Sequence, residues 1–298
     1  MKGQGHWLPG EKVYGDTVRI RGHLDLFSGI GGFSLALERA GVETEWIGYS
    51  DIDKHCNQVF KRRFNNAENM GDIKKIRAED LPRLDLVTFG FPCQDLSVAN
   101  IRNRKGLKGK RSSLFFEAMR IIRDKKPKHF IAENVRGVFS SNGGKDFEII
   151  LKEFIDAGYD CQWELLNSMY EGGVPQNRFR CYFVGHRRGE SRPKVFPLGR
   201  YGKETKKEGK EIRIADWRSD EGLRIRKNNM SPTLTTSTPI YIVGDRIRRI
   251  TPVEAARLQG FPDNWNDCCS DNQRYRQYGN AITVNLAESI FRKLYKLD

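Results

Sequence analysis

Short apolar runs alternate with longer amphipathic stretches from His23 to about Gly185. This alternation is typical of repeated strand and helix units around a mostly parallel sheet, so the sequence predicts an α/β fold. Strands are expected within 23–29, 46–51, 84–90, 129–135 and 180–187. Helices are expected within 32–41, 54–64, 113–127 and 146–159.

The composition changes between about Arg187 and Arg246, where Lys, Arg, Glu, Ser and Thr dominate and apolar runs are few. Such a change predicts a separate, irregular module or a long insertion. After it, residues 251–265 are expected to form a short helix and a turn, and residues 280–297 a terminal amphipathic helix. Residues 1–22 form an extension whose structure the sequence does not predict.

The formal net charge of +14 is compatible with a polyanionic partner, because Lys and Arg neutralise phosphates, and equally with a basic enzyme. No stretch reaches the ~20 apolar residues of a membrane span, and the start lacks the apolar core of a signal peptide, so a cytoplasmic protein is expected. The six cysteines show no zinc-binding spacing. They are therefore expected to be reduced thiols, with no metal site.

A glycine-rich turn follows the first expected strand, in DLFSGIGGFSLALERAG at 25–41. Gly29, Gly31 and Gly32 permit positive φ and allow the backbone to approach a ligand, and the start of the next helix favours negative charge. This pattern predicts a nucleotide-type site, although an ordinary tight turn would give the same residues. The spacing also departs from the GxGxxG dinucleotide pattern.

Acidic residues lie where an adenosine-type cofactor needs them. Asp51 closes the second expected strand, and a carboxylate there can accept hydrogen bonds from both ribose hydroxyls. Asp51 and Asp53 could instead be solvated turn residues or a helix N-cap. Asp72, in GDIKKI, carries the same two interpretations.

Cys93 lies in the turn GFPCQDLS, directly after a buried strand. Open α/β sheets bind ligands at the carboxyl ends of their strands, so this thiol is a candidate nucleophile. The attacking form would be the thiolate, which nearby basic groups stabilise. The alternative is a buried structural cysteine.

Two further groups of polar residues accompany expected strands. Glu133 follows HFIA, and a carboxyl group there could protonate or hydrogen-bond a heterocycle; the alternative is a helix-start residue. Alternation along VPQNRFRCYFVG would place Gln176, Arg178 and Arg180 on one face of a strand. That face could be functional or merely solvated.

Six segments, in this order, resemble the motif set of the cytosine carbon-5 DNA methyltransferases: DLFSGIGG, GFPCQ, ENV, QNRFR, RLQGFPDNW and QYGNAITVNL. The resemblance covers about 23–185 and again about 248–298. It implies a Rossmann-like methyltransferase domain at 23–186 and a target-recognition domain at 187–247. Residues 248–298 would follow, with 270–298 returning to the catalytic domain.

The resemblance also implies the reaction, which is sequence-specific methyl transfer from S-adenosylmethionine to carbon 5 of cytosine in double-stranded DNA by a monomer, without a metal. The implied cofactor residues are Phe27, Gly29, Gly31, Gly32, Asp51, Ile52, Asp72, Ile73, Gly90, Pro92, Leu114, Asn280 and Ala281. Many family members carry Glu in place of Asp51 and an aromatic residue in place of Ile52.

By the same resemblance, Cys93 adds to carbon 6, and Glu133 holds ring nitrogen 3 and the exocyclic amine. Arg178, with Arg180 and Gln176 in support, would orient the base and Cys93. The target base must first leave the stacked duplex. The basic segment 94–113, which includes Ser97, Arg104 and Lys105, is expected to close over the target base. The pair Thr233-Leu234 resembles a recognition signature.

Three alternatives remain open from the sequence. One branch of the family methylates transfer RNA, but this chain lacks the Cys-Phe-Thr signature associated with that branch. A DNA-binding homologue without catalysis would not need Cys93, Glu133 and Arg178. A nicotinamide-dependent oxidoreductase, suggested by the glycine turn alone, would leave Cys93 and Glu133 unexplained.

Overall fold

The computed structural model describes residues 18–91, 114–200, 213–218, 222–226, 230–244 and 246–297. The main strands are β1 (Val18–Leu26), β2 (Val42–Ser50), β3 (Glu68–Asn69), β4 (Leu86–Gly90), β5 (His129–Val135), β6 (Tyr159–Asn167) and β8 (Phe179–Arg187). The helices are α1 (Gly32–Arg39), α2 (Lys54–Arg63), α3 (Leu114–Lys125), α4 (Lys145–Asp156), α5 (Pro252–Leu258), α6 (Asp271–Asn280) and α7 (Val284–Tyr295). Short 3₁₀ helices are η1 (Ile73–Lys75), η2 (Ala78–Asp80) and η5 (Arg136–Gly144).

The main strands form one seven-stranded sheet in the order β3-β2-β1-β4-β5-β8-β6. Neighbours from β3 to β5 are parallel, and β8 runs antiparallel to both β5 and β6. The predicted α/β fold with a mostly parallel sheet is therefore confirmed. Because β1, β2, β4 and β5 are parallel, their carboxyl ends share one edge, where ligands bind in such sheets.

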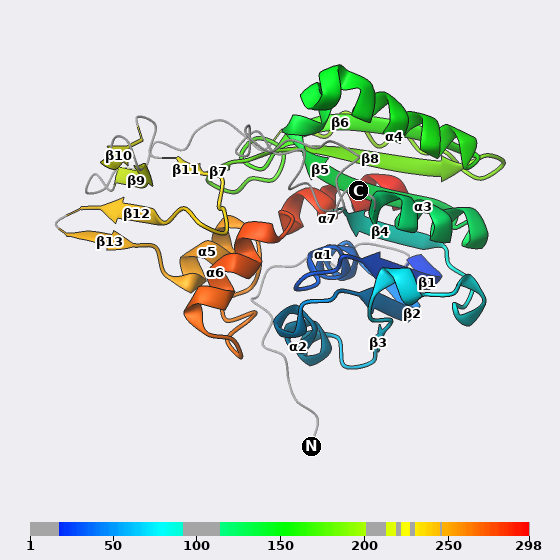
Figure 1. Ribbon diagram of the computed structural model, residues 1–298, viewed down its shortest axis with the longest axis horizontal. Helices are drawn as coiled ribbons and strands as arrows, with labels where there is room; N and C mark the ends of the chain where they lie inside the picture. The colour runs from blue at the N-terminus through cyan, green and yellow to red at the C-terminus, as the bar shows by residue number, and fades with distance from the viewer. Residues whose placement is uncertain are drawn as a thin grey trace.

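Helices cover both faces of this sheet (Figure 1). One core contains buried side chains of α1, α5 and α7, including Leu35, Ala256 and Ile290. The other contains buried side chains of α3 and α4, including Met119 and Phe154. Two apolar layers around a central sheet are the expected way to bury both faces of parallel strands.

Local sequence accounts for several helix boundaries. Gly31, in the left-handed region at φ 84°, precedes α1, and Gly41 follows it at φ 83°. The side chain of Asp53 accepts hydrogen bonds from the backbone of His55 and Cys56 and so caps α2. At α5, Thr251 and Glu254 form a reciprocal capping box.

The module expected to be irregular instead contains a small sheet. Its strands β9 (Arg213–Arg218), β10 (Gly222–Ile225), β12 (Ile240–Val243) and β13 (Ile247–Arg249) are antiparallel in the order β10-β9-β12-β13. The expectation of an irregular module is wrong for these residues. Figure 1 shows this sheet beside α5 and α6, away from α3 and α4.

One further pair of strands connects the antiparallel module to the segment that leads into the seven-stranded sheet. β11 (Ser231–Pro232) pairs in parallel with β7 (Gln176–Asn177), which directly precedes β8. α6 and β6 were not expected from the sequence, and the terminal helix begins at Val284 rather than at 280. β1 begins at Val18, within the segment that sequence analysis treated as an extension. Across the described ranges, no helix is long and apolar enough to cross a membrane.

Candidate active site

The glycine-rich turn between β1 and α1 adopts backbone conformations that suit ligand approach. Phe27 and Gly29 both have φ 53°. A Cβ built on Gly29 would meet nothing within 4 Å, so the space beside this residue is open. By contrast, a Cβ on Gly31 would lie 2.7 Å from the Phe64 ring. Gly29 therefore exposes backbone, whereas Gly31 allows close packing of the turn on α2.

Asp51 lies at the end of β2 and is tied to this turn. Its Oδ2 accepts a hydrogen bond from the Gly29 N–H at 2.9 Å, and its Oδ1 accepts one from the Asp53 N–H at 2.8 Å. Burial raises the pKa of Asp51, and these backbone donors oppose the increase. Each carboxylate oxygen keeps a further lone pair that could accept a ligand hydroxyl.

Ile52, the next residue, is 80% exposed. A large apolar side chain so open to solvent beside a half-buried carboxylate and a glycine turn is a candidate contact for a flat apolar ring. Asp72 caps η1 by accepting from the Lys74 N–H at 3.1 Å, and Ile73 is buried.

The loop before α7 reaches the same turn from the other end of the chain. A Cβ on Gly32 would lie 2.7 Å from Cγ1 of Ile282, so Ile282, two residues after Asn280, packs directly on the start of α1. Asn280 is exposed there, and Ala281 is half-buried. Leu114, at the start of α3, is half-buried against the core on the other face.

Trp265 supports the glycine turn from outside it. Its indole N–H donates to the carbonyl of Ile30 at 2.8 Å. Arg63 lies over the Trp265 ring at 4.9 Å and donates to the Trp265 carbonyl at 2.6 Å. The end of the RLQGFPDNW segment thus fixes the turn in place.

Glu133 and Arg180 form a nearly buried ion pair between β5 and β8. The distance from Arg180 Nε to Glu133 Oε1 is 2.8 Å, and the two side chains are 13% and 12% exposed. A Cβ on Gly90, the register neighbour of Glu133 on β4, would lie 3.4 Å from Glu133 Oε2. Oε2 therefore faces the last residue of β4, where the segment GFPCQ begins.

The family model for C-5 cytosine-specific DNA methylases matches residues 22–231 and 199–296. The chain belongs to this family. The resemblance drawn from the ordered motifs is confirmed. Among curated methylases, the Type II methyltransferase M.NlaX of Neisseria lactamica is 33% identical over 300 residues, covering 91% of this chain and 95% of that protein. The Type II methyltransferase M.HhaI of Haemophilus parahaemolyticus is 28% identical over 306 residues, covering 90% and 92%.

Solved structures of more distant methyltransferases share the fold. The Schizosaccharomyces pombe Dnmt2 methyltransferase has a TM-score of 0.67 at 20% identity, covering 94% of this methylase and 100% of that chain. The Entamoeba histolytica methyltransferase EhMeth has a TM-score of 0.68 at 18% identity, covering 93% and 98%. The Rossmann-like methyltransferase fold is thus confirmed.

Arg178 lies among backbone carbonyl groups. It is 2% exposed, and its guanidinium donates to the carbonyls of Leu234 at 3.0 Å, Ala281 at 2.8 Å and Gly279 at 3.4 Å. The ion pair to Glu133 that the structure describes comes from Arg180. That Arg178 orients the base and Cys93, with Arg180 and Gln176 in support, stays a prediction.

Gln176 also has a structural role in this methylase. Its Oε1 accepts from the Leu234 N–H at 2.8 Å, and its Nε2 donates to the Leu258 carbonyl at 2.7 Å. Leu234 is 5% exposed and belongs to the core, so its side chain does not face solvent. The Thr233 hydroxyl donates to the Asn177 carbonyl at 3.0 Å, which leaves Thr233 the more exposed member of the pair.

Five predicted residues lie outside the described residues: Pro92, Cys93, Ser97, Arg104 and Lys105. Cys93 follows Gly90, the last residue of β4, by three residues in the sequence.

Two residues that organise the candidate site of this methylase were not expected from the sequence. Trp265 was visible as an aromatic after a Gly-Phe-Pro turn, but nothing in the sequence indicates its bond to Ile30. Gln259 donates to the Tyr278 carbonyl at 2.7 Å and accepts from the Thr283 hydroxyl at 3.0 Å. Among the described residues, no group of three His, Cys, Asp or Glu side chains could hold a metal ion, and the five described cysteines are free.

Proposed function

We propose that this family member methylates carbon 5 of cytosine in duplex DNA by covalent activation, with Cys93 as the nucleophile. The observation that supports this most strongly is the Glu133–Arg180 pair, which lies beside Gly90, three residues before Cys93 in the sequence. A nucleophile, a carboxyl group and a fixed cation are what attack on carbon 6 requires.

Each residue has a separate task in this proposal. The Cys93 thiolate forms a bond to carbon 6, and Glu133 hydrogen-bonds ring nitrogen 3 and the exocyclic amine. Arg180 holds the Glu133 carboxylate in position and keeps positive charge near the base. After the methyl group reaches carbon 5, loss of the carbon-5 proton allows the Cys93–carbon 6 bond to break.

The cofactor proposed is S-adenosylmethionine, which supplies an electrophilic methyl group when bound. The residues present fit it: Gly29 leaves open space, the oxygens of Asp51 retain lone pairs for ribose hydroxyls, and Ile52 offers an exposed apolar side chain for adenine. Asp72, Ile73, Leu114, Asn280 and Ala281 complete the proposed site. Phe27, Gly31, Gly32, Gly90 and Pro92 shape it.

The DNA partner is proposed from the family and from the charge of +14. Flipping the target base would cost roughly a few kcal/mol, which phosphate contacts by basic residues such as Arg104 and Lys105 would offset. The antiparallel module and Thr233 would contribute to sequence recognition. Action as a monomer in the cytoplasm belongs to the same proposal, and relatives of bacterial and phage origin support the cytoplasmic location.

A covalent trap tests this proposal directly. Duplex DNA containing 5-fluorocytosine lacks the carbon-5 proton whose loss releases the enzyme. We expect a DNA–protein adduct that survives denaturation, forms only with methyl donor present, and is absent in Cys93→Ala.

The trap needs two controls. Cys56→Ala, which removes another free thiol, should leave the adduct intact. Defined transfer RNA should show no methyl incorporation under conditions in which duplex DNA is methylated. Activity on RNA alone, or an adduct that persists in Cys93→Ala, would overturn the proposed function.

A further inference from the structure

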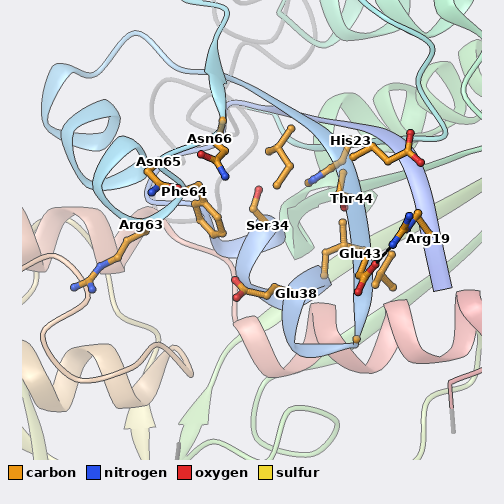
Figure 2. A pocket seen from close by; sticks show the side chains of 16 residues that line it. Arg19, His23, Ser34, Glu38, Glu43, Thr44, Arg63, Phe64, Asn65 and Asn66 are labelled. Atoms are coloured by element: carbon orange, nitrogen blue, oxygen red, sulfur yellow. Dashed lines mark hydrogen bonds and ion pairs between the residues drawn. The ribbon is translucent and has the colours of Figure 1, made fainter. Parts of the chain in front are cut away.

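A second cavity lies away from the active site. Its volume is about 720 Å³, and it is bounded by α1, β2 and the residues that follow α2 (Figure 2). Its lining includes Arg19 and Glu43, near the amino ends of β1 and β2. The glycine turn and Asp51 follow the carboxyl ends of these strands. This cavity, called the β2 groove below, is therefore separate from the proposed cofactor site.

His23 gives the β2 groove a buried polar atom without a partner. The ring lines the groove and is 0% exposed, and its Nδ1 has no hydrogen-bond partner among the described residues. Its Nε2 lies 2.7 Å from the Thr88 hydroxyl. That hydroxyl donates to Asp25 Oδ1 at 2.9 Å, and Ser34 donates to Asp25 Oδ2 at 2.9 Å.

The protonation state of His23 follows from this chain of bonds. Because the Thr88 proton points to Asp25, the Thr88 oxygen must accept from Nε2–H. Burial keeps the ring neutral by lowering the His23 pKa to about 3. Nδ1 is therefore an unprotonated acceptor. A buried acceptor without a partner is unfavourable, so a hydrogen-bond donor placed at this point would stabilise the ring.

The charges around the β2 groove favour a cationic donor. Glu38 and Glu45 line it, and their carboxylates have no ion pair or hydrogen bond among the described residues. Glu43 is already paired with Arg19 at 2.8 Å. Figure 2 shows Arg63 turned away from the other lining side chains, consistent with its bonds to the segment at Trp265.

Apolar side chains separate these polar groups. Leu37 and Val42 are buried, and Ile47 and Phe64 are half-buried along the same groove. Methylene groups could pack on these side chains, and the Phe64 ring could face an ammonium group. A ligand that fits must combine N–H donors, more than one positive charge and an aliphatic chain.

We propose that the β2 groove binds an aliphatic polyamine. One amine donates to His23 Nδ1, and the charged ends lie against Glu38 and Glu45. The methylene chain packs along Ile47 and Phe64. The inference does not depend on the methyltransferase activity, because none of these groups belongs to the proposed active site.

Isothermal titration with spermidine, without DNA and at pH 8, tests this site. We expect saturable binding of one spermidine per chain. In Glu38→Gln/Glu45→Gln, which removes two carboxylates near solvent, the dissociation constant should rise about tenfold or more. The matched control is Asp124→Asn/Glu148→Gln, which changes the net charge equally on α3 and α4 and should shift affinity less than about twofold.

A second measurement addresses His23 itself without mutating a buried residue. In histidine-labelled protein, the nitrogen resonance of unprotonated Nδ1 should move toward its hydrogen-bonded position when spermidine is added. Sodium chloride at matched ionic strength should leave it unchanged. Equal loss of affinity in both double variants, no saturable binding, or an unmoved Nδ1 resonance would each overturn the inference.

Discussion

Arg178 and Arg180 are separated by one residue, yet their guanidinium groups do different work. Arg178 binds backbone carbonyls at Leu234 and Ala281, and Arg180 binds the Glu133 carboxylate. The carbonyl contacts of Arg178 hold the backbone of the protein in place. The contact of Arg180 with the Glu133 carboxylate orients a group that can act on substrate. We therefore propose that Arg180 makes the catalytic contribution that depends on Glu133.

Replacing Arg180 with Gln should lower kcat for DNA methylation by roughly 10²–10³, because a fixed cation beside the reacting base is lost. Binding of S-adenosylmethionine should stay within about twofold, since Arg180 does not contact the glycine turn. Labelled-methyl incorporation under saturating donor measures the first, and calorimetric titration the second. Arg188→Gln, at an exposed ion pair with Asp160, is the control. A kcat equal to the control's would contradict the assignment.

Two neighbouring aspartates allow a paired test of the cofactor site. Asp51→Ala should weaken S-adenosylmethionine binding by about tenfold or more, because the proposed ribose contacts and the bond that orients Gly29 are both lost. Asp53→Ala should instead lower the free energy of unfolding by about 1 kcal/mol through loss of the α2 cap, with little change in affinity. Equal affinities in the two variants would remove Asp51 from the proposed site.

At the scale of elements, the segment 231–236 connects the antiparallel module to the large sheet. β11 pairs with β7, and Gln176 and Arg178 bond to Leu234. The end of α6 packs against the same segment, since a Cβ on Gly279 would lie 2.7 Å from the Thr235 backbone. The orientation of the module thus depends on buried polar bonds as well as on apolar packing.

Arg178→Ala should lower the free energy of unfolding by about 3 kcal/mol, because it removes a buried cation and leaves several carbonyls without a partner. Urea unfolding, followed by circular dichroism, measures this loss. Arg187→Ala, at the end of β8, serves as a control with a half-buried i,i+3 ion pair to Glu190 and an expected loss below about 1 kcal/mol. A loss no larger than the control's would show that Arg178 does not hold the module in place.

Elements that bury a continuous apolar face could be predicted from the sequence, and the others could not. Leu86–Gly90 and His129–Val135 lie within runs that read directly as buried strands. α6 was missed because DNQRYRQYGN has no apolar periodicity, and it is held by contacts such as Asn266 Nδ2 to Gln277 Oε1 at 2.7 Å. Alternation placed Arg178 and Arg180 on one face of a strand, but it does not identify the partner of either guanidinium group.

At the scale of the whole molecule, titratable groups lie buried on several strands of the large sheet. His129 on β5 and His186 on β8 meet through their Nδ1 atoms at 3.1 Å, and they are 8% and 1% exposed. Burial lowers the pKa of each to about 4. His23 shifts in the same direction, whereas burial raises the pKa of Asp25 to about 7. As the pH falls, protonation of the histidines therefore lowers the stability of the folded chain, whereas protonation of Asp25 raises it.

The histidine contribution predicts loss of stability in acid. The pKa of His129 and of His186 lies below the ordinary 6.5 in the folded chain, so the unfolded chain binds protons first as the pH falls. The contribution of the two histidines to the stability of the fold is therefore complete above about pH 6.5 and declines toward pH 4. Each ring titrating alone would account for on the order of 2–3 kcal/mol. Asp25 changes in the opposite direction over part of this range, so the pair must be isolated by difference.

Urea unfolding from pH 7.5 to 4.5, compared between the wild type and His129→Gln/His186→Gln, isolates the pair. The wild type should lose on the order of 5 kcal/mol more than the variant over this range, since only the wild type must keep both rings neutral. His55→Gln, outside the buried pair, should follow the wild-type curve. Parallel curves for the wild type and the double variant would show that the buried pair does not set the acid sensitivity of the fold.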